Sequence, residues 1–74
     1  MTSEAFQQIA HTIPHQPGIY KYFDAQNELL YVGKAKDLRK RVSSYFTKTF
    51  TSYKTHELVK RIHHLEFTIV NSEQ

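Results

Sequence analysis

The chain has 74 residues and a mass of 8.8 kDa, the size of one small domain. It contains no cysteine, so a disulfide framework and a thiolate zinc site are excluded, and a reducing, cytoplasmic setting is expected. Apolar residues make up 39% of the chain, enough for a modest core, so we expect a folded domain. No apolar run reaches the ~18–20 residues of a membrane span, so we expect no membrane partner.

The net charge of +3 is unevenly placed along the chain. Residues 1–33 hold one base against three acids, residues 34–61 hold nine bases against two acids, and residues 62–74 hold two acids and no base. Half of the bases fall within eight residues: Lys34, Lys36, Arg39, Lys40 and Arg41. This density predicts contacts with nucleic-acid phosphates, and a solvated helix face is the alternative.

The N-terminal residues predict a helix. Apolar side chains recur at helical spacing from Phe6 to Ile13. Ser3 is a candidate N-cap, and Pro14 would end the helix. We therefore expect residues 1–16 to form a packing helix and a linker.

The next segment predicts a β-hairpin. Residues 18–23 are mostly aromatic or β-branched, residues 24–28 have turn chemistry, and residues 29–32 are apolar. Alternation along the two strands gives each strand two faces. The candidate core face consists of Ile19, Phe23, Leu30 and Val32. If these residues form the core, Tyr20 and Tyr31 lie side by side on the opposite face.

A basic amphipathic helix should follow, with Asp37 as its cap. Its apolar stripe consists of Leu38, Val42, Tyr45 and Phe46. At about 100° per residue, Lys40 points away from this stripe and Arg41 lies at the border between core and solvent. Arg41 is therefore the base best placed to lean over the sheet.

The remaining elements are a loop over Thr47–Ser52, a helix and a third strand. Leu58, Ile62 and Leu65 share one helical stripe, and residues 67–70 read as a strand. The prediction is an α+β fold, in the order α-β-β-α-α-β, with a small three-stranded antiparallel sheet flanked by helices.

We expect residues 1–74 to form a single domain with a motif-bearing core over residues 17–71 and a tail over residues 72–74. The chain ends four residues after the last predicted strand without a closing element, so a C-terminally truncated domain is expected.

Two phenols, an ammonium group and a guanidinium group gather around the hairpin and the helix after it. They belong to Tyr20, Tyr31, Lys34 and Arg41. Phosphodiester cleavage uses such a set, because cations hold charge on the phosphate oxygens and a base deprotonates the attacking water. A tyrosine can be that base if neighbouring cations lower its pKa from about 10. The alternative is that both tyrosines are cross-strand aromatics that stabilise the hairpin.

The motif residues resemble a known nuclease family. Pro17-Gly18-Ile19-Tyr20, then Tyr31-Val32-Gly33-Lys34 with Arg41, and finally Ser43-Ser44-Tyr45-Phe46 are similar to the GIY-YIG nucleases. Within that family they resemble the N-terminal nuclease domains found in the C component of excinuclease ABC, from about Ile13 to Gln74. The resemblance implies a metal-dependent DNA endonuclease that makes the 3′ incision at DNA lesions in nucleotide excision repair, as part of the SOS response. It implies damaged double-stranded DNA and the B component of the excinuclease as partners, with the A component acting upstream. The alternative is a GIY-YIG-like module that binds DNA or a partner without catalysis.

The resemblance also implies roles for single residues. Tyr31 is the first choice for the general base, Tyr20 orients the site, and the assignment between the two tyrosines stays open. Arg41 would bind the scissile phosphate, with support from Lys34. The same resemblance and the local charge assign DNA contacts to Lys34, Lys36, Arg39, Lys40 and Arg41. Gly18 and Gly33 would allow close approach of backbone or ligand, although a twist or a bulge also explains them.

One divalent metal, Mg²⁺ or Mn²⁺, is implied for the complete domain. In the family its glutamate ligand lies on a helix after the third strand, which corresponds to a position beyond residue 74. Glu57, Glu66 and Glu73 do not match that position, so we expect no metal ligand within this chain. His56, His63 and His64 also lack the i, i+4 spacing of a helical zinc pair. The isolated chain is therefore expected to be a monomer that binds no metal tightly and is inactive.

Overall fold

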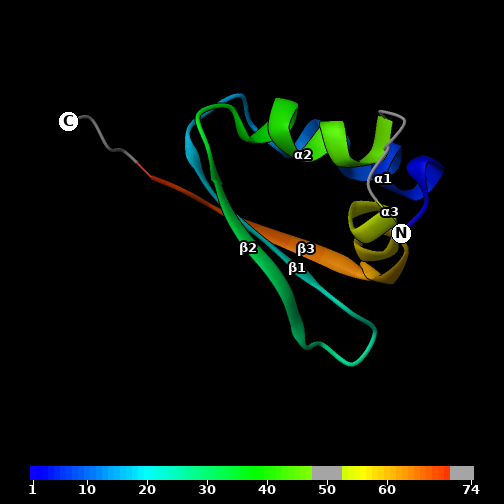
Figure 1. The fold of residues 1–74 in the computed structure, drawn as a ribbon. Helices are drawn as coiled ribbons and strands as arrows, with labels where there is room; N and C mark the ends of the chain where they lie inside the picture. Colours follow the sequence, from blue (N-terminus) through cyan, green and yellow to red (C-terminus); the bar gives the residue numbers. More distant parts are fainter. Residues whose placement is uncertain (48–52, 71–74) are drawn as a thin grey trace.

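The computed structural model describes residues 1–47 and 53–70. Its elements, in chain order, are α1 (Ser3–Ile9), a short 3-10 helix η1 (Ala10–Thr12), β1 (Gly18–Phe23), β2 (Leu29–Ala35), α2 (Leu38–Thr47), α3 (Tyr53–Arg61) and β3 (His64–Ile69) (Figure 1). The predicted α+β class and element order are confirmed. Within the described residues, no helix has the length and apolar character needed to cross a membrane.

The sheet has the order β2-β1-β3, and both neighbouring pairs are antiparallel. In the central strand β1, Tyr20 lies opposite Gly33 of β2 and Phe67 of β3. Tyr22 lies opposite Tyr31. Since alternate residues share a face, Tyr20, Tyr22 and Tyr31 lie on one face of the sheet, as expected for Tyr20 and Tyr31.

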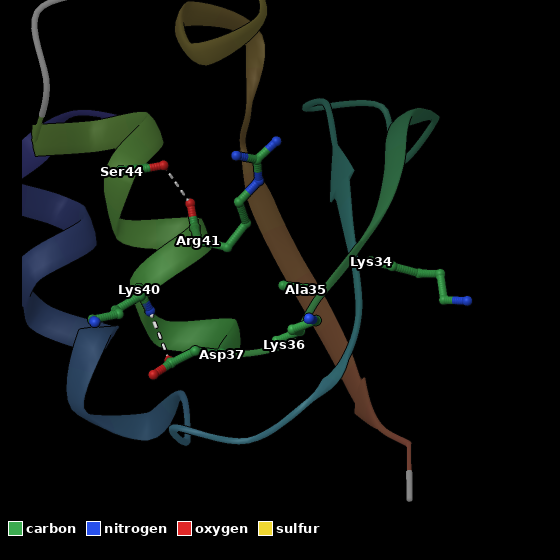
Figure 2. A pocket seen from close by; sticks show the side chains of 7 residues that line it. All are labelled: Lys34, Ala35, Lys36, Asp37, Lys40, Arg41 and Ser44. Atoms are coloured by element: carbon green, nitrogen blue, oxygen red, sulfur yellow. Dashed lines mark hydrogen bonds between the residues drawn. The ribbon is translucent and has the colours of Figure 1, made fainter. Parts of the chain in front are cut away.

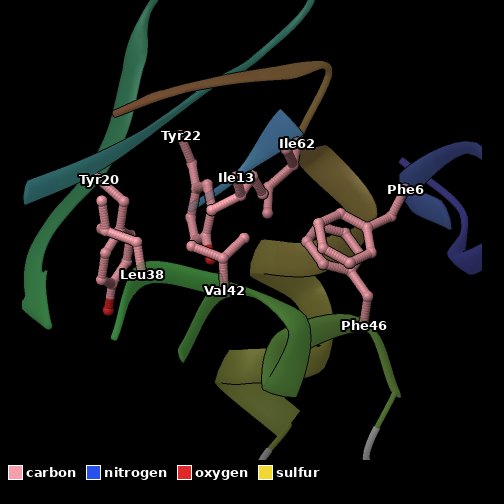
Figure 3. Packing of buried hydrophobic residues seen from close by; sticks show 8 residues of the cluster. All are labelled: Phe6, Ile13, Tyr20, Tyr22, Leu38, Val42, Phe46 and Ile62. Carbon is pink, nitrogen blue, oxygen red and sulfur yellow. The ribbon is translucent and has the colours of Figure 1, made fainter. Parts of the chain in front are cut away.

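The face that forms the core differs from the prediction. Tyr20 and Tyr22 are 1% and 0% exposed, whereas Val32, on the opposite face, is 47% exposed. The buried core consists of Phe6, Ile13, Tyr20, Tyr22, Leu38, Val42, Phe46 and Ile62 (Figure 3).

Both faces of the hairpin carry large apolar groups, so alternation alone cannot decide which face is covered. The tyrosine face is the buried one because α1 and α2 pack on that side of the sheet, where Phe6, Leu38 and Val42 join the tyrosines in the core. Figure 1 shows α1 and α2 on one side of the sheet, with α3 near the end where β3 begins. In Figure 3 the two β1 tyrosines point toward Leu38 and Val42.

The hairpin turn at residues 24–28 agrees with its sequence. The Asp24 carboxylate accepts hydrogen bonds from the backbone N–H groups of Gln26 and Glu28, both at 2.9 Å. Asn27 has φ 67°, a left-handed conformation that asparagine tolerates. β2 continues beyond the predicted Val32 to Ala35, so Lys34 lies within a strand.

The N-terminal helix begins one residue earlier than expected. Thr2, not Ser3, is the N-cap, because its hydroxyl accepts a 3.0 Å hydrogen bond from Ala5 N–H. The Ser3 hydroxyl instead donates to the Phe46 carbonyl at 2.7 Å and ties α1 to the end of α2. The predicted cap of α2 is confirmed, since Asp37 Oδ1 accepts a 3.0 Å hydrogen bond from Lys40 N–H.

The last helix is shorter than its apolar spacing suggests. Leu65 belongs to β3, which begins at His64 and not at Phe67, and Ile62 follows the last residue of α3. Leu65 is paired with Tyr22 in the sheet, so strand pairing replaces the third helical turn. Apart from Thr47, the loop predicted over residues 47–52 lies outside the described residues, as does the tail over residues 72–74.

Candidate active site

The centre of the candidate site is a contact between β1 and α2. Arg41 Nε donates a hydrogen bond to the buried Tyr20 hydroxyl at 3.4 Å. The Tyr20 hydroxyl also lies 3.2 Å from the Tyr45 hydroxyl, and either oxygen can donate. The hydrogen bond to Tyr20, followed by its charge interaction, raises the pKa of Arg41. The helix therefore positions Arg41 over the sheet, as its helical angle predicted, and keeps it cationic.

Of the three tyrosines on this face of the sheet, Tyr31 is the exposed one. Its side chain is 41% exposed, whereas Tyr20 is 1% exposed. The ring centroids of Tyr20 and Tyr31 are 6.1 Å apart, and the Tyr31 ring stacks on Tyr22 with centroids 6.4 Å apart. The cross-strand aromatic contacts explain how the fold holds Tyr31, while its exposure leaves it able to meet a ligand.

Tyr45 belongs to this cluster although its spacing indicated only a place in the apolar stripe of the helix. The Arg41 guanidinium carbon lies 5.7 Å from the centroid of the Tyr45 ring, a cation–π distance. Burial, and then the hydrogen bond with Tyr20, raises the pKa of the Tyr45 phenol. One available signal was its i, i+4 position relative to Arg41, which puts the two side chains on one helix face.

A hollow of about 430 Å³ opens beside Arg41. It is lined by Lys34, Ala35, Lys36, Asp37, Lys40, Arg41 and Ser44 (Figure 2). A second hollow of about 200 Å³ is lined by Arg41, Ser44, Tyr45 and Thr55 of α3. Because both hollows include Arg41 and Ser44, Arg41 lies where they meet.

The basic residues predicted to bind DNA are not equally placed. Lys36 and Lys40 line the larger hollow together with Arg41. Lys34 lies opposite Ile19 in the sheet, on the face away from the tyrosines. Figure 2 shows its side chain extending away from Arg41, although the residue lines the hollow. The fold thus separates the ammonium group of Lys34 from the guanidinium group that it was expected to support.

Arg39 has structural contacts. Its Nε donates to the Ile13 carbonyl at 2.6 Å, and its Nη2 donates to the His11 carbonyl at 3.2 Å. These bonds tie α2 to the segment that contains η1. Arg39 does not line either hollow at Arg41. The geometry therefore gives this residue a role in holding the helix.

Both motif glycines lie where a side chain does not fit. A β-carbon at residue 33 would lie 2.5 Å from Cζ and Oη of Tyr20. A β-carbon at residue 18 would lie 2.3 Å from the Thr68 carbonyl oxygen and 2.7 Å from Cδ1 of Leu38. Close approach is thus the reason for both glycines, and at Gly33 the approaching group is a motif tyrosine.

The described residues do not form a metal site. No group of three His, Cys, Asp or Glu residues able to hold a metal ion occurs within residues 1–47 and 53–70. Asp37, the carboxylate that lines the larger hollow, already caps α2 and lies 3.0 Å from Nδ1 of His15. Glu57 pairs with Lys60, and Glu66 with His64, both at 3.8 Å. Glu73 lies outside the described residues.

Comparison with known proteins identifies the motif. Residues 16–74 match the family described as the UvrC-like GIY-YIG domain. UvrABC system protein C of Actinobacillus pleuropneumoniae serotype 5b is 57% identical over 61 residues, which cover 82% of this chain and 10% of the relative. The protein of the same name from Cytophaga hutchinsonii is 45% identical over 74 residues, covering 99% of this chain and 12% of the relative. The chain therefore spans about a tenth of the length of these relatives.

Solved structures agree with the sequence match. The GIY-YIG N-terminal endonuclease domain of UvrC from Thermotoga maritima, described as a point mutant bound to its catalytic divalent cation, matches with a TM-score of 0.77 and 27% identity, over 95% of this chain and 74% of that one. The same domain bound to magnesium matches with a TM-score of 0.75 and 26% identity, over 92% of this chain and 73% of that one. With its motif, its fold and these relatives in agreement, this chain belongs to the family of UvrC-like GIY-YIG domains.

Proposed function

We propose that this chain is the GIY-YIG endonuclease domain of a UvrC protein, which hydrolyses a DNA phosphodiester bond on the 3′ side of a lesion during nucleotide excision repair. The observation that carries the proposal is the Arg41 guanidinium, which hydrogen bonds Tyr20 on the sheet face where Tyr31 is exposed. Family membership and the names of the relatives support the same activity.

Arg41 would bind the scissile phosphate. Its guanidinium group lies at the meeting point of two hollows, and Tyr20 and Tyr45 hold it from the protein side. A guanidinium group matches the planar spacing of two phosphate oxygens and remains charged throughout the reaction. In this position it would neutralise charge on the non-bridging oxygens as the bond to the attacking water forms.

Tyr31 would be the general base. Its exposed phenol can reach a water molecule at the phosphate, whereas the Tyr20 hydroxyl is buried and already bonded to Arg41 and Tyr45. In the reaction, the Tyr31 oxygen would accept a proton from the water as the water oxygen bonds to phosphorus. The bond from phosphorus to the leaving oxygen would break, and that oxygen would take a proton from solvent. The raised pKa of Tyr45 keeps that phenol protonated, so it would position Arg41.

A divalent cation would complete the site in the full-length protein. The described residues offer phenol oxygens near Arg41 and no set of carboxylates there, so they do not fit a tightly bound cation by themselves. We propose that the carboxylate ligand comes from a part of the full-length protein outside these 74 residues, and that the cation is Mg²⁺ or Mn²⁺. The UvrC domain from Thermotoga maritima is bound to magnesium as its catalytic cation, which supports the proposal of a divalent cation here.

The DNA would lie along the basic hollow at α2. Lys36 and Lys40 would contact phosphates on either side of the one bound by Arg41. Damaged double-stranded DNA is the proposed substrate, the other components of the UvrABC system are the proposed partners in the cytoplasm, and the isolated chain is proposed to be a monomer. Since residues 1–47 and 53–70 place no carboxylate set at Arg41, we propose that the isolated chain binds DNA without cutting it.

The test has two parts. Amide chemical shifts of the 74-residue chain are followed during titration with a short DNA duplex at low salt and again at higher salt. Salt-sensitive shifts at Tyr31, Lys36 and Arg41 are expected, and the absence of any response at these residues would contradict the proposed site. In the full-length protein, supplied with its partner proteins and damaged duplex, Tyr31→Phe should abolish the 3′ incision without weakening DNA binding.

A further inference from the structure

A third hollow of about 270 Å³ lies along α3, apart from the two that include Arg41. We refer to it as the α3 hollow. It is lined by Leu30 of β2 and by Tyr53, Lys54, Glu57, Leu58 and Arg61 of α3. None of these residues lines the Arg41 hollows, and the proposed mechanism uses none of them.

The lining combines apolar surface with cations at both ends. Lys54, Leu58 and Arg61 are spaced at i, i+4 and i+7, so they form one stripe, with the two cations about 10 Å apart along the helix axis. Tyr53, in the first turn, is 76% exposed. Exposed aromatic rings next to basic groups are typical of surfaces that bind unpaired nucleic-acid bases, because every base offers a face for stacking.

The single acid in the α3 hollow also fits this ligand. Glu57 pairs with Lys60 on the same helix at 3.8 Å, and Lys60 does not line the hollow. A carboxylate beside an apolar surface repels phosphate but accepts hydrogen bonds from the exocyclic amino group of a base. The apolar and aromatic part of the hollow therefore suits a base, and its two cations, Lys54 and Arg61, suit phosphates.

The α3 hollow also lies next to the candidate active site along the helix. Thr55, which adjoins Lys54 in the sequence, lines the hollow that contains Arg41 and Tyr45. A strand bound at Arg41 that continues across Thr55 would therefore meet Lys54 and Tyr53 next.

We propose that the α3 hollow binds one unpaired nucleotide of the DNA strand that Arg41 holds. The base lies on the Tyr53 ring beside Leu30 and Leu58, and the flanking phosphates contact Lys54 and Arg61. This inference rests on the proposed function, because the same strand must reach both sites. It adds a preference for DNA with an unpaired base near the incised bond, since a base within a continuous duplex cannot stack on a protein ring.

The chain contains no tryptophan, which gives a direct test. Tyr53→Trp places a single indole at the proposed stacking position, and His56→Trp places one at an exposed position on the same helix that does not line the hollow. Each variant is titrated with a blunt duplex and with a duplex carrying a short unpaired gap. Tryptophan fluorescence is the measured signal. In Tyr53→Trp, we expect the gapped duplex to quench it at several-fold lower DNA concentration than the blunt duplex does. In His56→Trp, we expect either duplex to quench it little.

Charge variants provide the matched control. Lys54→Ala and Arg61→Ala should each weaken binding of the gapped duplex about fivefold or more at low salt. Lys21→Ala removes the same charge from an exposed position on the sheet face away from the tyrosines and should leave binding nearly unchanged.

The outcomes separate this inference from the proposed function. Equal quenching of the two tryptophan variants, or equal response to both duplexes, would overturn the stacking site. Chemical-shift changes at Arg41 and Tyr31 without changes along α3 would overturn it while leaving the proposed function intact. No response at either place would contradict both. Changes along α3 with partner proteins but not with DNA would assign the hollow to a protein and would also overturn the inference.

Discussion

Gly33 makes the room in which the Tyr20 ring lies. The two residues are opposite each other in neighbouring strands, and a β-carbon at residue 33 would lie 2.5 Å from both Cζ and Oη of Tyr20. Since the Tyr20 hydroxyl holds Arg41, the second motif glycine acts on the proposed phosphate site through the first motif tyrosine. The two halves of the motif are therefore parts of one packing arrangement.

Gly33→Ala should displace the Tyr20 ring and disturb Arg41. Overpacking of this kind costs about 1–3 kcal/mol, so we expect a loss of that size in the free energy of unfolding measured in urea. We also expect weaker DNA binding by the molecules that remain folded. Val32→Ala, at the exposed neighbouring position, is the control and should change stability by less than about 0.5 kcal/mol. Equal effects of the two substitutions would contradict the packing role of Gly33.

Removal of the buried Tyr22 hydroxyl should stabilise the protein. Tyr22 is fully buried, and its hydroxyl has no hydrogen-bond partner among the residues that the structure describes. A buried polar group without a partner costs free energy, so Tyr22→Phe should raise the free energy of unfolding by about 1 kcal/mol. Tyr20→Phe is the matched comparison and should lower it, because the Tyr20 hydroxyl bonds Arg41 and Tyr45. A loss of stability in Tyr22→Phe would show that its hydroxyl has a partner after all.

The raised pKa of the Tyr22 phenol predicts a loss of stability at alkaline pH. Burial is the main cause that raises the pKa of Tyr22 above its ordinary value near 10. The folded protein therefore keeps this proton at a pH where the unfolded chain releases it, and stability falls as the pH rises above about 10. Unfolding in urea at several pH values between 8 and 11 measures the decline. It should be shallower in Tyr22→Phe, and identical slopes in the two proteins would contradict the assignment.

The features predicted correctly from the sequence are mostly local. The hairpin, the Asp37 cap and the position of Arg41 follow from turn chemistry, capping and helical angle, all of which are set within a few residues. The face of the hairpin that becomes the core depends on which side the helices cover, and no residue in the hairpin decides that. Tyr20 was therefore expected on the face opposite the core but is part of the core.

The functional cluster depended on the same distant contacts. Tyr45 fitted an apolar stripe, and its contact with Tyr20 appears only once α2 is packed on the tyrosine face. Arg39 and Arg41 differ by two residues and were both predicted to contact DNA, yet Arg39 bonds the Ile13 carbonyl and Arg41 bonds a phenol. Charge density could therefore locate the basic segment but not assign a role to each cation.

Acidification should weaken the start of α2. The hydrogen bond from Lys40 N–H is the largest cause that lowers the pKa of Asp37, and His15 contributes further. Because the pKa of Asp37 is lower in the folded protein, its ionised carboxylate stabilises the fold at pH values above the pKa of the unfolded chain, near 3.9. That stabilisation is lost as the pH falls through the pKa of the folded protein. The free energy of unfolding, measured in urea at pH 6 and at pH 3, should therefore change less between the two pH values in Asp37→Asn than in the unmodified protein. Glu28→Gln, at an exposed turn position, should follow the unmodified protein, and the same behaviour in Asp37→Asn would refute the effect.

Arg39 and Arg41 provide the sharpest separation of structure from function. Arg39→Ala removes two hydrogen bonds to the carbonyls of His11 and Ile13, so it should lower the free energy of unfolding by about 1–2 kcal/mol. DNA binding by the folded fraction should remain. Arg41→Ala should instead reduce DNA affinity. It should also make the plot of log affinity against log salt concentration less steep by about one unit, as expected for the loss of one phosphate contact.

Arg41→Lys refines this comparison, because it keeps the charge but loses the hydrogen bond that Nε donates to Tyr20. If Arg41 serves only as a positive charge, the lysine variant should bind DNA as the unmodified chain does, and in the full-length protein it should incise normally. If the phenols orient a guanidinium group toward the phosphate, the lysine variant should retain most of the salt dependence and lose incision. We expect the second result, since Tyr20 and Tyr45 contact Arg41 through a hydrogen bond and a ring face rather than through charge alone. Loss of stability in Arg41→Ala with unchanged DNA affinity would assign the whole cluster to packing.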